Sequence, residues 1–70
     1  MKNTDYEKIK SLFKSYKNKY KKEYGLAYLI WLNNNEQGIE PDTTNLSYMG
    51  KQAVRMDIAK IIKGDSNETL

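Results

Sequence analysis

The side chains best suited to chemistry in this 70-residue chain lie near its C-terminal end. Arginine can pair with guanine through two hydrogen bonds and glutamine with adenine, while lysine can neutralise a phosphate. In the segment at about residues 45–63, these residue types gather on one side at helical spacing. That side is therefore predicted to contact double-stranded DNA. An ordinary solvated helix surface is the alternative interpretation. The predicted nucleic-acid-binding residues are Tyr48, Lys51, Gln52, Arg55 and Lys63.

The opposite side of the same segment is apolar and is predicted to pack on the rest of the domain. Its residues are Leu46, Met49, Ala53, Val54, Ile58 and Ile61. Side chains that can cap a helix start occur from Thr43 to Ser47, and Gly64 is a typical stop. The sequence therefore predicts a helix over about residues 45–63.

The sequence GKQAVRMDI at residues 50–58 has a distinctive order of residue types. It begins with a small residue, a basic residue and glutamine. These are followed by a small residue, a β-branched residue, arginine, any residue, aspartate and an aliphatic residue. This order resembles the recognition helix of helix-turn-helix repressors of the DeoR type, over residues 49–61. The resemblance implies a motif without the family's β-hairpin wing, with Val54 and Ile58 in the core. The residues that it implies to face DNA are Lys51, Gln52 and Arg55.

A second basic feature lies in the first third of the chain. Residues 1–24 contain eight lysines against three acidic residues, a net charge of +5, whereas the whole chain carries +3. A lysine strip beside aromatic rings can follow a phosphate backbone and stack bases. The alternatives are a solvated helix flank whose lysine stems cover the rings, and a helix lying on an anionic membrane. The strip consists of Lys10, Lys14, Lys17 and Lys21.

The sequence contains few side chains suited to catalysis or to metal binding. The chain has no histidine and no cysteine, so its serines lack the usual base and zinc lacks its usual ligands. No glycine-rich phosphate loop is present. We therefore expect no enzyme, no metal and no cofactor. The longest apolar run is too short to span a bilayer and is not placed as a signal peptide, so we expect a cytoplasmic protein.

The aromatic residues of the first half recur at helical spacing. Tyr6, Ile9 and Phe13 begin a stripe that continues in phase through Trp31. Glycine costs a helix interior about 1 kcal/mol relative to alanine, yet the stripe crosses Gly25 without a shift. The sequence therefore predicts one long helix over about residues 5–33, with a kink possible at Gly25.

The segment LAYLIWL at residues 26–32 is apolar around the full helical turn. Such a segment is buried on several sides, either at the centre of a core or between subunits. A chain this short has little else to cover it, so we expect a homodimer. The predicted interface consists of Leu26, Tyr28, Leu29, Trp31 and Leu32.

The stretch at 36–45 is acidic and polar, and Gly38 and Pro41 interrupt it. It is predicted to connect the helices, with a short helical turn possible near residues 41–46. Thr43 and Thr44 stand where the DeoR-type motif has an apolar residue and alanine. The chain as a whole is predicted to be a single all-α domain over residues 1–70.

Two functions follow from these observations. The first is a small DNA-binding regulatory or accessory protein that uses the C-terminal helix as its recognition helix. The second is a helical protein-interaction module, such as a mobile-element protein that binds and inhibits or recruits a host protein, because Tyr, Trp and Arg dominate binding hot spots. Exposure of the Lys51, Gln52 and Arg55 side chains on one convex surface would favour the first.

Overall fold

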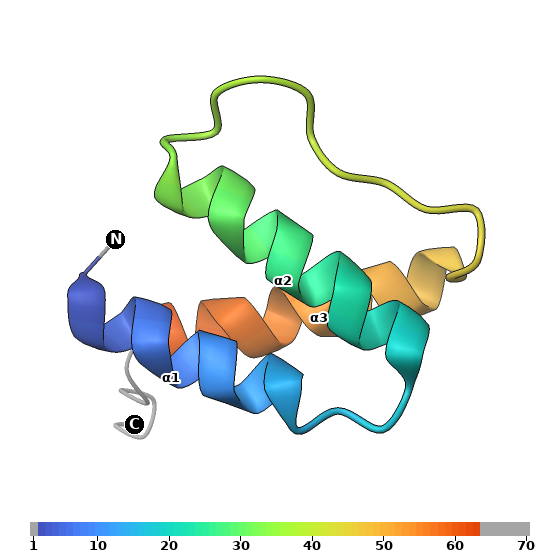
Figure 1. Cartoon of the computed structure of the whole chain (residues 1–70), viewed down its shortest axis with the longest axis horizontal. Helices are drawn as coiled ribbons and strands as arrows, with labels where there is room; N and C mark the ends of the chain where they lie inside the picture. The colour runs from blue at the N-terminus through green and yellow to red at the C-terminus, as the bar shows by residue number, and fades with distance from the viewer. Residues whose placement is uncertain (1, 64–70) are drawn as a thin grey trace.

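The computed structural model describes residues 2–63, which form three packed α-helices (Figure 1). These are α1 (Asn3–Lys14), α2 (Lys19–Asn33) and α3 (Tyr48–Ile62). No strand occurs within this range, so the all-α class is confirmed. None of the three helices is long and apolar enough to cross a membrane. The predicted helix stop at Gly64 lies outside the described residues.

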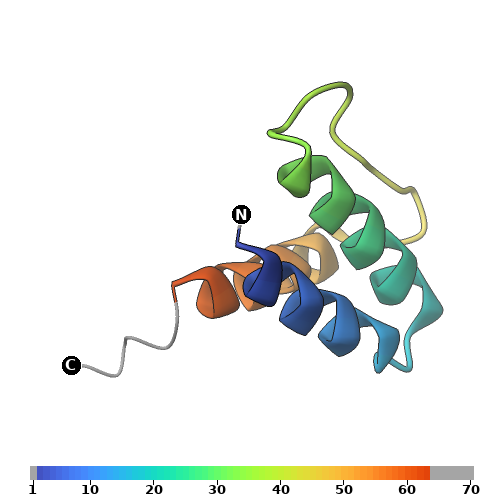
Figure 2. The same cartoon turned by 60° about the vertical axis from the view of Figure 1, so that its left-hand side comes forward.

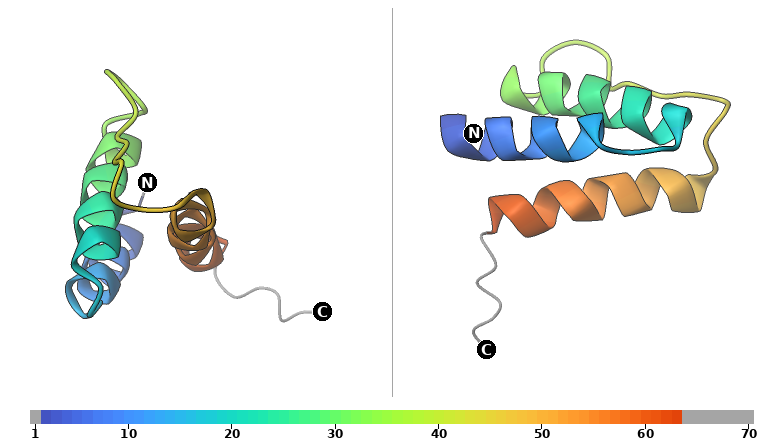
Figure 3. Two further views of the ribbon diagram at one scale, coloured as in Figure 1. Left: turned by 90° about the vertical axis from the view of Figure 1, so that its right-hand side faces the viewer. Right: turned by 60° about the horizontal axis from the view of Figure 1, so that its bottom comes forward.

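The prediction of one helix over residues 5–33 was wrong, because α1 and α2 form an antiparallel hairpin (Figure 3). The Ser15 hydroxyl donates to the Leu12 carbonyl at 2.6 Å, which closes the end of α1. The Asn18 side chain accepts hydrogen bonds from the backbone N–H groups of Tyr20 and Lys21, which caps the start of α2. Local capping groups therefore reverse the chain where hydrophobic spacing shows no interruption.

Gly25 does not kink α2, which continues through it. The residue is buried and lies against Phe13 of α1. A Cβ atom placed on Gly25 would lie 2.8 Å from the Cγ and Cδ1 atoms of the Phe13 ring. Glycine therefore lets the two helices approach each other closely.

The core lies between all three helices, and each helix contributes two buried hydrophobic side chains. They are Ile9 and Phe13, Tyr24 and Leu29, and Val54 and Ile58. The Phe13 ring meets the Tyr16 ring edge-on, with 5.1 Å between centroids. The Tyr16 hydroxyl donates a hydrogen bond to the Asp57 carboxylate, so a polar contact joins the turn after α1 to α3 beside this core.

Most of the residues predicted to form a dimer interface are used within the single chain. Leu29 is buried, while Leu26, Tyr28 and Leu32 pack against the core. The Trp31 side chain is half-buried, and its Nε1 atom lies 3.4 Å from the Gly38 carbonyl oxygen. Most of the apolar run is therefore covered by α1, α3 and the following segment, although Ile30 is 60% exposed. A homodimer through this run stays a prediction.

The residues between α2 and α3, 34–47, contain no helix and arch back to the start of α3 (Figure 2). We call them the connector. The short helical turn predicted near 41–46 is only a turn at Thr44 and Asn45. The C-terminal helix begins at Tyr48 rather than near residue 45, because the Ser47 side chain accepts the Gly50 N–H at 3.0 Å and caps it.

Candidate functional site

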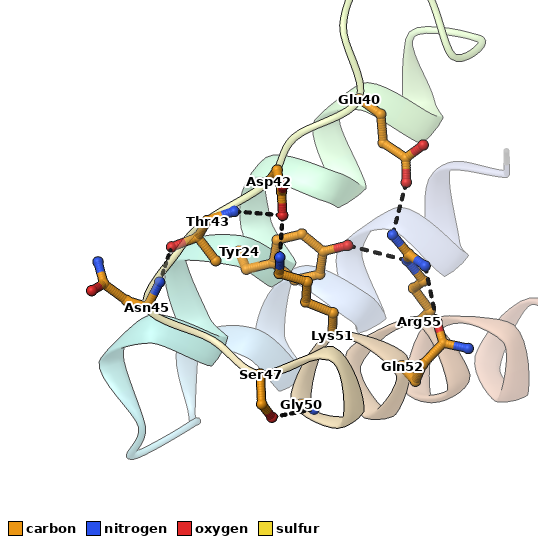
Figure 4. Close-up of polar contacts among 10 residues, drawn as sticks. All are labelled: Tyr24, Glu40, Asp42, Thr43, Asn45, Ser47, Gly50, Lys51, Gln52 and Arg55. Atoms are coloured by element: carbon orange, nitrogen blue, oxygen red, sulfur yellow. Dashed lines mark hydrogen bonds and ion pairs between the residues drawn. The ribbon is translucent and has the colours of Figure 1, made fainter.

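The residues predicted to contact DNA meet the acidic connector at a polar surface pocket. Carboxylates of the connector turn toward α3, and basic side chains of α3 reach out to them (Figure 4). The pocket has a volume of about 330 Å³. It is lined by Glu40, Pro41, Asp42, Tyr48, Lys51 and Arg55.

Arg55 is held from four directions. Its Nε atom donates to the Tyr24 hydroxyl at 3.1 Å, and one Nη atom donates to Gln52 Oε1 at 2.9 Å. The other Nη atom pairs with Glu40 Oε2 at 2.9 Å. Its Cζ atom also lies 5.4 Å from the centroid of the Tyr28 ring, within range of a cation–π contact. The planar guanidinium is therefore bound by side chains of α2, α3 and the connector.

Lys51 is held by the same segment. Its ammonium group forms an ion pair with the Asp42 carboxylate, and only 18% of the Lys51 side chain is exposed. The hydrogen bond from Lys51 and a second from the Thr43 backbone N–H lower the pKa of Asp42. Because the folded-state pKa is depressed, this contact stabilises the fold above the ordinary aspartate pKa and is lost as the pH falls through the lowered value.

The predicted DNA-reading residues therefore do not form one open convex surface. Lys51 and Arg55 turn toward α2 and the connector, and Gln52 accepts a hydrogen bond from Arg55. Tyr48 is 71% exposed at the rim of the pocket, and Lys63 is exposed at the C-terminal cap. While these contacts hold, the face lined by Lys51 and Arg55 cannot enter a DNA groove. Sequence reasoning treated the acidic connector as a separate segment, whereas the fold lays it over the basic face.

The predicted apolar face of α3 is also rotated relative to the core. Val54 and Ile58 are buried as expected, but Met49 is 79% exposed. Met56, which the sequence did not single out, is 61% exposed and lies two turns further along the same side. The reason is that burial of Val54 and Ile58 between α1 and α2 sets the rotation of α3, which leaves the methionine flank facing solvent.

The hairpin divides the predicted lysine strip. Lys10 lies in α1, with its Nζ atom 5.8 Å from the centroid of the Tyr6 ring, whereas Lys17 lies in the turn after α1. The hairpin brings in lysines that the strip omitted, so that five gather near the turn. They are Lys14, Lys17, Lys19, Lys21 and Lys22. Within residues 2–63, no acidic side chain pairs with any of the five.

No protein-family model matches the chain, and neither a curated protein nor a solved structure is significantly similar to it.

Proposed function

We propose that this chain is a helical protein-interaction module that docks a partner on the solvent-facing side of α3. The observation that carries the proposal is the exposure of Met49 and Met56 on one side of the helix. Ala53 lies between them and is half-buried, so the surface is narrow and apolar along two turns. Methionine is flexible and polarisable, which suits it to contact surfaces.

The residues around this methionine face indicate the chemistry of the partner. Helical spacing places Gln52 and Lys60 on the same side, and within residues 2–63 no salt bridge joins Lys60 to a carboxylate. Asp57 points away, toward Tyr16 in the turn between α1 and α2. The far side of α3 faces no other helix of the described chain (Figure 3). The complementary surface is an amphipathic helix of another protein, with apolar residues along its centre and carboxylates along its edge.

A double variant of the methionine face provides the test. Replacing Met49 and Met56 with serine is expected to weaken partner binding about tenfold or more, because both anchors lose their apolar contact. The fold should survive, since both side chains are exposed. The measurement is a parallel pull-down of parent and variant from nuclease-treated host lysate, followed by titration of the purified partner.

Ile30→Ser is the matched control, because Ile30 is 60% exposed but lies on α2. The control should bind as the parent does. Recovery of no protein partner, or equal binding by parent and double variant, would contradict the proposal. A concentration-dependent homodimer lost in the double variant would replace the partner with a second copy of this chain.

DNA binding through α3 is a second candidate function, and the exposure of the connector carboxylates favours it. The Glu40 and Asp42 side chains are 44% and 77% exposed, and exposed ion pairs contribute little to stability. A DNA phosphate can therefore compete with these carboxylates for Arg55 and Lys51. In this proposal the connector must move away before Gln52 and Arg55 reach base edges.

Removing the two competing charges tests this candidate. Glu40→Gln with Asp42→Asn is expected to raise the affinity for duplex DNA, and adding Arg55→Ala should abolish the gain. Glu7→Gln with Glu36→Gln changes the net charge equally at two exposed sites and controls for bulk electrostatics. Fluorescence anisotropy at two salt concentrations is the measurement. Equal gains in both double variants would count against a site on α3.

A further inference from the structure

From the lysines at the α1–α2 turn we infer a second binding surface, which takes the phosphate backbone of a nucleic acid without sequence preference. We call it the hairpin patch. It consists of Lys14, Lys17, Lys19, Lys21 and Lys22. The patch goes beyond the proposed protein-docking function, because it lies on other elements than the methionine face of α3 and has a different ligand.

The fold, rather than the sequence spacing alone, creates this patch. Lys14 ends α1, Lys17 lies in the turn, and Lys19 starts α2. The four-residue reversal therefore holds charges from two helices at one end of the molecule (Figure 1). Because no acidic side chain of residues 2–63 pairs with them, these charges stay available for an external anion.

The neighbouring side chains favour a nucleic acid over other polyanions. Asn18 is exposed in the turn, and because only its side-chain oxygen caps α2, its amide N–H groups can donate to a phosphate. Lysine is depleted in protein interfaces, which makes an acidic protein a poor match. An amphipathic membrane anchor needs a large apolar face, but Tyr20 is the one large hydrophobic residue exposed in the described turn and the first turn of α2.

Tyr20 adds an aromatic surface beside the lysines. The ring is 39% exposed, and the Lys19 Nζ atom lies 5.5 Å from its centroid. Cation and ring are thus adjacent, as in surfaces where a backbone phosphate and a base are held together. Single-stranded nucleic acid can use both contacts, whereas duplex DNA uses the charges alone.

The test is a triple variant, Lys14→Gln with Lys17→Gln and Lys19→Gln. All three side chains are exposed, so the fold should be unaffected, which circular dichroism can verify. Each phosphate contact contributes about 0.9 to the log–log dependence of affinity on salt for duplex DNA. The triple variant should therefore reduce the slope of log affinity against log salt concentration by up to about 2.7. Between 50 and 200 mM salt, its loss of affinity should then be about 40-fold smaller than that of the parent.

The matched control changes three exposed lysines at the other end of the helices. Lys2 precedes α1, Lys8 lies in its first half and Lys60 lies in the last turn of α3. Their replacement by glutamine removes the same charge and should leave the slope closer to that of the parent. The probes are a mixed-sequence duplex, its isolated single strand, and vesicles containing phosphatidylserine.

Three outcomes would overturn the inference. The first is an absence of binding to either nucleic acid at low salt. The second is an equal loss in the triple variant and its control, which would indicate only bulk charge. The third is binding to the anionic vesicles without binding to nucleic acid, which would assign the patch to a membrane surface. The methionine variants leave these lysines unchanged, so failure here is distinguishable from failure of the protein-docking proposal.

Discussion

Gly25→Ala is expected to destabilise the domain by about 1–3 kcal/mol, the usual cost of overpacking a well-filled core. The added Cβ would lie 2.8 Å from atoms of the Phe13 ring, and that ring is fully buried. Either the ring or the whole of α1 must shift to make room. Thermal unfolding measures the effect, because each 1 kcal/mol lowers the melting temperature by about 4–8 °C in a domain of this size.

The sign of this effect separates two explanations of Gly25. Helix propensity alone predicts that alanine stabilises α2 by about 1 kcal/mol. Gly50→Ala is the control, because its new Cβ lies closest to the Cδ1 end of the flexible Leu46 side chain, at 2.8 Å, and 3.3 Å from the Ser47 hydroxyl oxygen. The control is expected to leave stability unchanged or to raise it by up to about 1 kcal/mol. A more stable Gly25→Ala variant would show that α1 and α2 are not as closely packed as described.

Tyr16→Phe is expected to destabilise the domain by about 1.5–3 kcal/mol, the range for a hydrogen bond to a charged group. Its hydroxyl donates to the Asp57 carboxylate, which joins the turn after α1 to α3, and the contact is part-buried. The variant keeps the ring and its contact with Phe13, so the loss reports the polar contact alone. Urea unfolding measures it, with Tyr48→Phe as the control because Tyr48 is largely exposed.

The same contact predicts a pH dependence. Burial raises the pKa of Tyr16, and the hydrogen bond and charge of Asp57 raise it further. A group whose folded-state pKa is raised stabilises the fold below its unfolded pKa, which is about 10 for tyrosine. That stability should therefore decline as the pH rises above about 10, and the decline should be smaller in Tyr16→Phe. Equal alkaline profiles for the parent and Tyr16→Phe would contradict a linked ionisation.

Periodicity identified much of the core because it is a local property of the chain. Ile9, Phe13, Val54 and Ile58 lie on the predicted apolar faces and are buried. The cap of α3 was also predictable, since Ser47 is one of the hydroxyl residues before the helix. The hairpin at residues 15–18 was not, because apolar residues recur at helical spacing across it in the sequence. As a result the buried face of α2 was also misplaced, since Leu29 is buried whereas Ile30 is 60% exposed.

In the candidate site, too, the sequence identified the residues but not their contacts. The sequence identified Arg55 and Lys51 as notable side chains, and it located the acidic residues of the connector. It did not indicate that these groups meet, because Glu40 lies fifteen positions from Arg55 and Asp42 nine from Lys51. Pairing across such separations depends on the path of the connector, which no local pattern specifies.

The sequence by itself therefore determined the helical class, the approximate extent of α3 and the residue types on its faces, since these follow from propensity, capping and spacing. Only the tertiary structure decided which face of α3 is open. Burial of Val54 and Ile58 sets the rotation of α3, so that the flank with Lys51 and Arg55 lies beside the connector carboxylates and the methionine flank faces solvent. The physical reason is that the rotation of a helix about its axis is set by the groups packed against it, which come from distant parts of the chain.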